Sequence, residues 1–135
     1  MTKKKKNWNL TEKEWQKQLS PEEYVVMREK GSEQPFTGKY WNSTEKGIYV
    51  CAACEQPLFS SEAKYETKTG WPSFYEALDP EVLETKPGGG MFVKKTEVLC
   101  SKCGCHLGDL FADGPEPTGH RYCINSIALK FEPEE

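Results

Sequence analysis

Two pairs of cysteines, each with two residues between its members, are the clearest chemical signal in the sequence. They are Cys51 with Cys54 and Cys100 with Cys103. Each pair can bind one tetrahedral metal ion through two thiolates, and two pairs complete a closed site of four sulfur ligands. Such a site is structural, because zinc chemistry needs an open coordination position. We expect one structural Zn²⁺, which we prefer to iron because no redox reaction is required of the metal.

Cys123 is the first candidate for a reactive group outside this metal site. It lies in a strand-like segment, residues 119–126, where alternation places Arg121, Cys123 and Asn125 on one face. A guanidinium near a thiol favours the nucleophilic thiolate, and Asn125 can hydrogen-bond a reacting group or the neighbouring strand. The same pattern also fits a buried structural cysteine.

A second cluster, formed by Cys105, His106 and Asp109, directly follows the second cysteine pair. His106 and Asp109 can meet across a bend at Gly108, and a carboxylate beside an imidazole orients it and favours its charged, proton-donating form. The alternative is a hydrogen-bonded loop histidine. Trp71, in a segment rich in aromatic residues, is by itself best interpreted as a core tryptophan.

The N-terminal part of the chain has the signals of two short helices. Thr11 with Glu14 and Ser20 with Glu23 have the spacing of capping boxes. A helical part is therefore expected over residues 9–31. We interpret it as a brace laid on a β domain, without reactive residues of its own.

From residue 36 to residue 132 the sequence consists of short strand-like runs separated by Gly, Pro and Asp. Residues 91–99 and 121–131 are the best strand candidates, and residues 47–50 lead into the first cysteine pair. Residues 87–90 predict a flexible glycine-rich turn. The expected fold is mainly β and antiparallel, with the short helices at its N-terminus.

The length of 135 residues and the net charge of −3 limit the classes of protein to consider. The length suits one domain, placed at residues 9–135, after a disordered basic N-terminus over residues 1–8. No signal-peptide or membrane-spanning pattern is evident, so free thiols in a reducing, cytoplasmic compartment are expected. The acidic balance gives no charge-driven attraction to nucleic acid. We expect a monomer.

Several motifs occur in a fixed order along the chain. They are Gly70-Trp71-Pro72-Ser73-Phe74, His106-Leu107-Gly108, Asp113-Gly114-Pro115, Gly119-x-Arg121-Tyr122-Cys123-Ile124-Asn125-Ser126 and Leu129-x-Phe131, together with both cysteine pairs. This set resembles the methionine-R-sulfoxide reductase B family over residues 24–131. The resemblance implies two antiparallel sheets with the active site on one of them, in agreement with the strand pattern.

The resemblance implies an oxidoreductase that repairs oxidised proteins by reducing peptide-bound methionine-R-sulfoxide to methionine. Cys123 would attack the sulfoxide sulfur and become a sulfenic acid, which thioredoxin or another thiol reduces again. Trp71 and Phe111 would bind the substrate, Trp71 through the S-methyl group. The sulfoxide oxygen would be protonated by a nearby acid or a held water, and His106, helped by Arg121 and Asn125, matches the polar side of the family's pocket. Asp109 is a further candidate catalytic residue there.

The sequence departs from the commonest pattern of this family in three places. Asp109 stands where most members have a second histidine, and it brings negative charge near the thiolate. Thr69 stands where many members have the cysteine that resolves the sulfenic acid. Cys105 is an additional cysteine and the alternative resolving thiol, although strand alternation puts it on the opposite face from His106. We therefore expect a thiol reductant to attack the sulfenic acid directly.

Two other classes of function are compatible with the residues alone. Paired Cys-x-x-Cys sites also occur in zinc-ribbon modules that bind nucleic acids or proteins, but the four residues inside the pairs carry one charge, on Lys102. A thiol redox sensor would oxidise Cys123 without turning over a substrate. Turnover separates the reductase from the sensor, and nucleic-acid binding would indicate the zinc-ribbon module.

Overall fold

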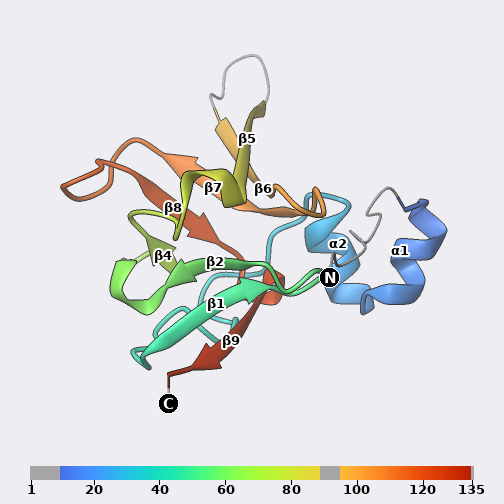
Figure 1. Cartoon of the computed structure of the whole chain (residues 1–135), viewed down its shortest axis with the longest axis horizontal. Coiled ribbons are helices and arrows are strands. Elements are labelled where there is room, and N and C mark those ends of the chain that lie inside the picture. Colours follow the sequence, from blue (N-terminus) through green and yellow to red (C-terminus); the bar gives the residue numbers. More distant parts are fainter. Residues whose placement is uncertain (1–9, 89–94, 135) are drawn as a thin grey trace, which may run out of the picture.

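Two antiparallel β-sheets and two short helices make up the described part of the protein (Figure 1). The computed structural model describes residues 10–88 and 95–134. The mainly β fold expected from the sequence is confirmed. The segment expected to be disordered, residues 1–8, lies outside the described residues, as do the end of the predicted turn 87–90 and the beginning of the strand predicted at 91–99.

Helices α1 (Glu12–Gln18) and α2 (Pro21–Met27) begin at the two predicted capping boxes. The Thr11 hydroxyl accepts a hydrogen bond of 3.2 Å from the Glu14 N–H, and the Glu14 carboxylate accepts one of 3.0 Å from the Thr11 N–H. The box at Ser20 has the same two bonds. These reciprocal bonds satisfy N–H groups that a helix leaves unpaired at its start.

The helices lie at one end of the sheets and are joined to each other by Arg28 (Figure 1). Arg28 forms a salt bridge of 2.9 Å with Glu12, and its guanidinium lies 4.8 Å from the centre of the Trp15 ring. Trp15, Val26 and Met27 are buried in the core. Within the described residues no helix is long and apolar enough to cross a membrane.

The smaller sheet has three strands in the order β2-β1-β9. Their bounds are β1 (Gly47–Cys51), β2 (Pro57–Ser60) and β9 (Leu129–Pro133). Tyr49 of β1 is completely buried, and the centre of its ring lies 5.2 Å from that of Phe74 and 4.8 Å from that of Phe131. Because Phe74 belongs to the other sheet, these aromatic contacts join the two sheets.

The larger sheet has six strands in the order β3-β4-β8-β7-β6-β5. Their bounds are β3 (Lys64–Tyr65), β4 (Ser73–Phe74), β5 (Leu83–Gly88), β6 (Lys95–Cys100), β7 (His106–Phe111) and β8 (Arg121–Ile124). Short 3-10 turns at Ser61–Ala63 and Pro80–Val82 precede β3 and β5. Phe74, Val98 and Ile124 are fully buried, so one face of this sheet packs on the core.

The single strand predicted at residues 121–131 is wrong. The chain leaves the larger sheet at Asn125, passes through a 3-10 turn (Ser126–Ala128) and enters the smaller sheet as β9. A hydrogen bond of 3.0 Å from the Ala128 N–H to the Asn125 carbonyl oxygen closes the turn. The residues after Asn125 therefore do not continue the face of the sheet on which Cys123 lies.

The turns that carry the two cysteine pairs share one pattern of backbone hydrogen bonds. In the first turn the Cys51 N–H donates to the Gln56 carbonyl at 2.9 Å, and the Glu55 N–H donates to the Cys51 carbonyl at 2.8 Å. The turn at Cys100 has equivalent bonds of 2.9 and 2.8 Å, with Gly104 in the position of Glu55. Both residues have positive φ, 64° for Glu55 and 77° for Gly104. A side chain is disfavoured in this conformation, so Glu55 strains the first turn.

We expect Glu55→Gly to raise the free energy of unfolding by about 0.5–1 kcal/mol, because loss of the Cβ relieves this strain while the freer unfolded chain offsets part of the gain. Chemical denaturation at saturating metal measures the change. Gly104→Ala is the matched variant. A Cβ at Gly104 meets no atom within 4 Å, so its positive φ alone should cost about 1 kcal/mol. A destabilised Glu55→Gly protein would contradict the equivalence of the two turns.

Candidate active site and metal centre

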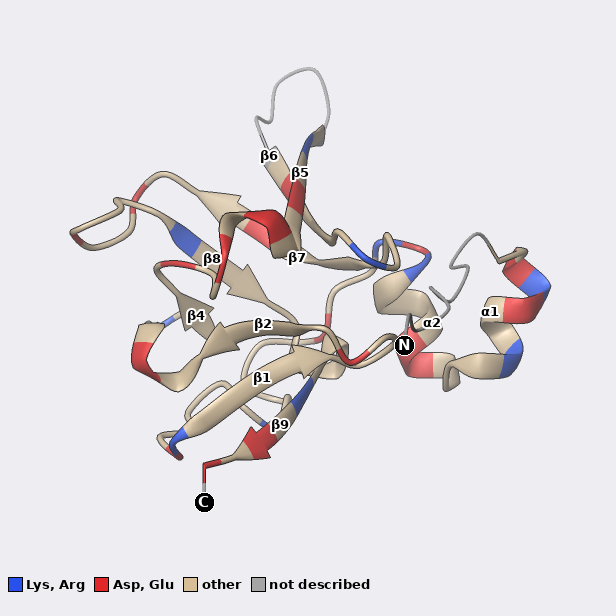
Figure 2. Ribbon diagram, viewed as in Figure 1, with Lys and Arg blue, Asp and Glu red and all other residues tan. Residues whose placement is uncertain are grey.

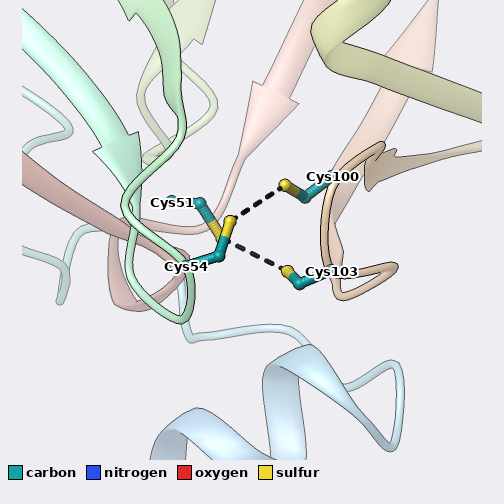
Figure 3. Close-up of side chains that lie close together, drawn as sticks. All are labelled: Cys51, Cys54, Cys100 and Cys103. Carbon is teal, nitrogen blue, oxygen red and sulfur yellow. Dashed lines mark hydrogen bonds between the residues drawn. The ribbon is translucent and has the colours of Figure 1, made fainter. Parts of the chain in front are cut away.

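Four buried cysteines from two turns meet in one cluster (Figure 3). Cys51 and Cys54 come from the turn between β1 and β2, whereas Cys100 and Cys103 come from the turn between β6 and β7. Their sulfur atoms all lie within 4.8 Å of one another, and the two contacts between the turns measure 3.7 and 3.5 Å. A tetrahedral ion with Zn–S bonds of about 2.3 Å places its sulfur ligands about 3.8 Å apart. The cluster therefore fits a closed tetrahedral metal site, as the cysteine spacing predicted.

Gln56 and Cys105 lie next to this cluster. The Gln56 side-chain amide donates to the Cys100 sulfur at 3.5 Å. Cys105 is fully buried, and its carbonyl oxygen accepts a hydrogen bond of 2.9 Å from the N–H of the ligand Cys100. Cys105 thus belongs to the surroundings of the metal cluster, and outer contacts of this kind orient metal ligands.

Cys123, the predicted nucleophile, lies within a row of side chains that crosses the larger sheet. On β8 it pairs with Ser73 of β4 on one side and with Asp109 of β7 on the other. Ser73 pairs in turn with Tyr65 of β3, and Asp109 with Glu97 of β6. Directly opposed residues project from the same face of a sheet. The row therefore places the thiol between a hydroxyl and a carboxylate.

A β-bulge in β7, rather than the predicted bend at Gly108, brings His106 and Asp109 to one face. Glu97 pairs with Asp109, but Leu99, two residues further along β6, pairs with His106. The extra residue in β7 shifts the alternation of its side chains by one position. His106 and Asp109 therefore project from the same face of the sheet as Glu97 and Leu99. The bulge thus re-aims the histidine towards the side of the sheet that carries the row.

His106 is buried against helix α2. Its exposed fraction is 4%, and its Nδ1 lies 3.1 Å from the Val26 carbonyl oxygen. A carbonyl oxygen only accepts hydrogen bonds, so Nδ1 carries a proton and Nε2 is the nitrogen that can take or give another. Just beyond the helix, Lys30 forms a salt bridge of 3.2 Å with Glu97. The end of α2 therefore fixes both the tautomer of His106 and one end of the row.

The surroundings of Cys123 raise the pKa of its thiol. Burial is the largest cause, and the carboxylates of Asp109 and Glu33 add to it, while the Thr69 hydroxyl and the Arg121 guanidinium lower the pKa. Arg121 thus favours the thiolate as the sequence predicted, but burial outweighs its effect. The thiol of Cys123 is therefore kept neutral at pH values where an ordinary cysteine begins to ionise.

Arg121 is held in place beside Cys123 by two neighbours. Its Nε donates to one carboxylate oxygen of Asp113 at 2.8 Å, and its Nη2 donates to the other at 3.2 Å. The guanidinium also lies 4.3 Å from the centre of the ring of Phe111, its cross-strand partner on β7. These contacts fix the planar group on the face of β8 that also carries Cys123.

Trp71 and Asn125 are both bonded to Glu33, which the sequence patterns do not single out. Trp71 Nε1 donates to the Glu33 carbonyl oxygen at 3.0 Å, and the Glu33 N–H donates to Asn125 Oδ1 at 3.0 Å. Asn125 Nδ2 donates to the Leu107 carbonyl oxygen, also at 3.0 Å. Asn125 therefore bonds the neighbouring strand, one of its two predicted partners, and a loop from the N-terminal part. No sequence motif or hydrophobic pattern could reveal Glu33, because its burial depends on contacts with residues far away in the sequence.

Removal of the metal ion is expected to unfold the protein and not merely to lower its activity. The cluster joins turns of both sheets, and the apparent binding energy of structural zinc sites, about 10–16 kcal/mol, is comparable to the whole stability of a domain. Thermal unfolding with and without a chelator measures the effect. Cys54→Ser should behave like the chelated protein, whereas Cys105→Ser, a matched change outside the four ligands, should retain the metal. Unchanged melting after metal loss would exclude the structural role.

Comparison with known proteins places the chain in one family. A protein-family model described as the SelR domain matches residues 19–133. A peptide methionine sulfoxide reductase MsrB from Methanosarcina barkeri is 53% identical over 125 residues, which cover 93% of this chain and 88% of that protein. A protein of the same name from Leptospira interrogans is 51% identical over 126 residues, covering 93% and 96%.

The fold also occurs outside these relatives. The solved structure of the Mis18 'Yippee-like' domain superposes with a TM-score of 0.52 at 14% identity, covering 67% of this chain and 99% of that one. At this identity the likeness concerns the fold alone. The family model and the relatives span nearly the whole chain. The chain therefore belongs to the SelR family, together with the peptide methionine sulfoxide reductases MsrB.

Proposed function

We propose that the protein reduces methionine-R-sulfoxide in oxidised proteins to methionine, with Cys123 as the nucleophile. The observation that carries this proposal is the row in which Cys123 lies between Ser73 and Asp109. Arg121 and Phe111 lie next to it on the same face. Membership of the SelR family supports the class of reaction. A thiol flanked by groups that can hold a proton suits the transfer of an oxygen atom from one sulfur to another.

In the proposed step, the sulfur of Cys123 attacks the sulfoxide sulfur. The sulfur–oxygen bond of the sulfoxide breaks and a sulfur–oxygen bond to Cys123 forms, so that the substrate sulfur is reduced by two electrons and the cysteine sulfur is oxidised by two. The sulfenic acid carries one proton, as the thiol did. Because the pKa of Cys123 is raised, a base must take the thiol proton during the attack. Asp109 is directly opposite Cys123 and accepts the thiol proton, while Nε2 of the protonated His106 ring gives the sulfoxide oxygen the proton that stays on the sulfenic acid. Return of the proton from Asp109 to His106 completes the balance.

The substrate side chain is held by aromatic residues in this proposal. Trp71 uses its indole N–H in a bond to Glu33, so its ring is left for apolar contact with the S-methyl group. Phe111, which packs against the Arg121 guanidinium, forms a second wall. An apolar ring, a proton donor and a nucleophile in fixed positions around a pyramidal sulfur distinguish its two epimers, which is the basis of the proposed preference for R.

We propose that thioredoxin or another external thiol reduces the sulfenic acid. One thiol displaces water from Cys123 to form a mixed disulfide, and a second thiol releases Cys123. Cys105 lies beside Cys100, whose N–H donates to its carbonyl oxygen at 2.9 Å. Cys100 is three residues from Glu97, the partner of Asp109, or about 10 Å along a strand, and Asp109 is the cross-strand partner of Cys123. Because a disulfide needs Cα atoms about 4.4–6.8 Å apart, Cys105 would have to leave the sheet to resolve Cys123.

Zinc is the metal that we propose for the four-cysteine cluster. Four thiolates in a tetrahedron suit it, and a closed site takes no part in the reaction. The metal-binding thiols and the nucleophile both require a reducing environment, for which we propose the cytoplasm.

A zinc-ribbon module that binds nucleic acid is less favoured. The Lys and Arg residues of the described part are spread over several elements among acidic ones (Figure 2), and the net charge is −3. Binding to phosphates needs a basic patch or stripe.

Turnover of the two resolved sulfoxide epimers tests the proposal. With excess dithiothreitol, the wild-type protein should consume only the R epimer of methionine sulfoxide in a peptide. Cys123→Ser should lose more than about 10³-fold in rate, because the nucleophile is removed. Consumption of the S epimer at an equal rate, or of the R epimer by Cys123→Ser, would refute the proposal. Oxidation of Cys123 without release of methionine would instead indicate a thiol redox sensor.

Cys105→Ser should keep the thioredoxin-dependent rate within about twofold of the wild-type rate, because the backbone hydrogen bond to Cys100 holds Cys105 in the turn before β7, away from Cys123. Steady-state turnover with thioredoxin, thioredoxin reductase and NADPH measures it. Release of one methionine per Cys105→Ser molecule followed by arrest would show that Cys105 is the resolving thiol. Intact metal content of the variant, measured in parallel, separates such an arrest from damage to the cluster.

A further inference from the structure

Glu33 is a buried acidic residue in the segment that follows helix α2. Its exposed fraction is 7%, whereas Glu29, four residues earlier, is exposed. Acidic residues are seldom buried unless hydrogen bonds compensate for the loss of water. The hydrogen bonds of Glu33 explain its burial, and they connect it to segments on both sides of Cys123.

Both backbone groups of Glu33 bond to side chains beside the nucleophile. Its N–H donates to Asn125 Oδ1 and its carbonyl oxygen accepts from Trp71 Nε1, each at 3.0 Å. Asn125 lies two residues after Cys123 in the sequence. Trp71 lies two residues before Ser73, and Ser73 is the cross-strand partner of Cys123. One residue of the N-terminal segment therefore connects the chain on both sides of the nucleophile.

The carboxylate of Glu33 holds this backbone in place. Oε1 accepts a hydrogen bond of 3.0 Å from the Ile127 N–H. Oε2 is buried without a hydrogen-bond partner among the described residues, and it occupies the space where a Cβ on Gly38 would fall. A side chain confined in this way has little freedom to move. The position of the Trp71 ring is thus linked, through the peptide groups of Glu33, to the turn after β8.

We propose that Glu33 is a positioning residue of the reductase, whose buried carboxylate holds the backbone that fixes the Trp71 ring relative to Cys123. The inference rests on the proposed function of these two residues. Trp71 presents its apolar ring in one orientation because its N–H is committed to Glu33. A displacement of about 1 Å in such a binding group can cost about 10²-fold in catalysis. The carboxylate also brings a negative charge near Cys123. This electrostatic effect on the thiol can be separated experimentally from the positioning of the Trp71 ring.

Two substitutions separate the reach of the Glu33 side chain from its charge. Glu33→Gln keeps the length and an oxygen for the Ile127 N–H, but it removes the charge. Glu33→Asp keeps the charge, but it is one methylene too short to reach the same N–H. Glu29→Gln, on the exposed surface, is the matched control. We would measure kcat and KM with a methionine-R-sulfoxide peptide, and the pH dependence of Cys123 alkylation, with Cys123→Ser as the blank.

Glu33→Asp should raise KM about tenfold, with less than about a threefold change in kcat and an unchanged pH midpoint of alkylation. Glu33→Gln should keep KM within about twofold and shift that midpoint to lower pH, because a carboxylate that disfavours the thiolate has been removed. Glu29→Gln should change neither quantity. A wild-type KM for Glu33→Asp, or equal increases for the Asp and Gln variants, would overturn the proposal.

Trp71→Phe keeps an apolar ring but lacks the N–H that Glu33 accepts, so it tests the same link from the other end. It should raise KM at least as much as Glu33→Asp, and Glu33→Asp should add little in that background. An unchanged KM would overturn the proposal even where Glu33→Asp does not fold. Absence of sulfoxide turnover by the wild-type protein would refute the proposed function itself. Normal sulfoxide turnover by the wild-type protein, together with additive effects of Glu33→Asp and Trp71→Phe on KM, would refute the positioning role of Glu33 but leave the proposed function intact.

Discussion

The four-cysteine cluster determines where the reactive part of the chain begins and ends. Strand β7 starts at His106, only three residues after the ligand Cys103. After Cys123 the chain turns into β9, where Leu129 pairs with Cys51, a ligand from the other turn. Both ends of the segment that carries Cys123, the proposed nucleophile, are thus fixed at the same metal centre. Only 36% of the residues are hydrophobic, so the core alone contributes less stability than a larger core would. The metal link therefore matters more for the stability of this chain.

Around Cys123, the groups that favour the thiolate and those that oppose it are brought in by different elements. Arg121 comes from the same strand, Asp109 from the neighbouring strand and Glu33 from the N-terminal segment. Arg121 is already paired with Asp113. The negative charge of Asp113 therefore offsets part of the effect that the positive charge of Arg121 has on the Cys123 thiol. Burial therefore decides the outcome, and the pKa of Cys123 is raised. A nucleophile kept neutral in this way must lose its proton as it attacks, which places a base on the proposed reaction path.

Features fixed by neighbouring residues were predictable from the sequence, and those fixed by distant contacts were not. The capping box at Ser20 and the metal-binding turn at Cys51 depend on residues within five positions, and both were predicted. The bulge that re-aims His106 depends on how β7 aligns with β6, and the break after β8 depends on the smaller sheet accepting β9. The same applies to Glu33, whose partners lie as far as residue 127. Periodicity within one segment contains no information about such pairings.

Two residues near Cys123, Thr69 and Asp109, act on its thiol in opposite directions. The Thr69 hydroxyl hydrogen-bonds Cys123 and lowers the pKa of its thiol, whereas the Asp109 carboxylate raises it. A hydroxyl can accept a hydrogen bond from a thiol and donate one to a thiolate, and that of Thr69 is held by a bond of 2.7 Å to Thr67. It therefore stabilises the ionised sulfur that Asp109 disfavours. Since the two effects have opposite signs, changing either residue alone would remove one of them and shift the pKa of Cys123.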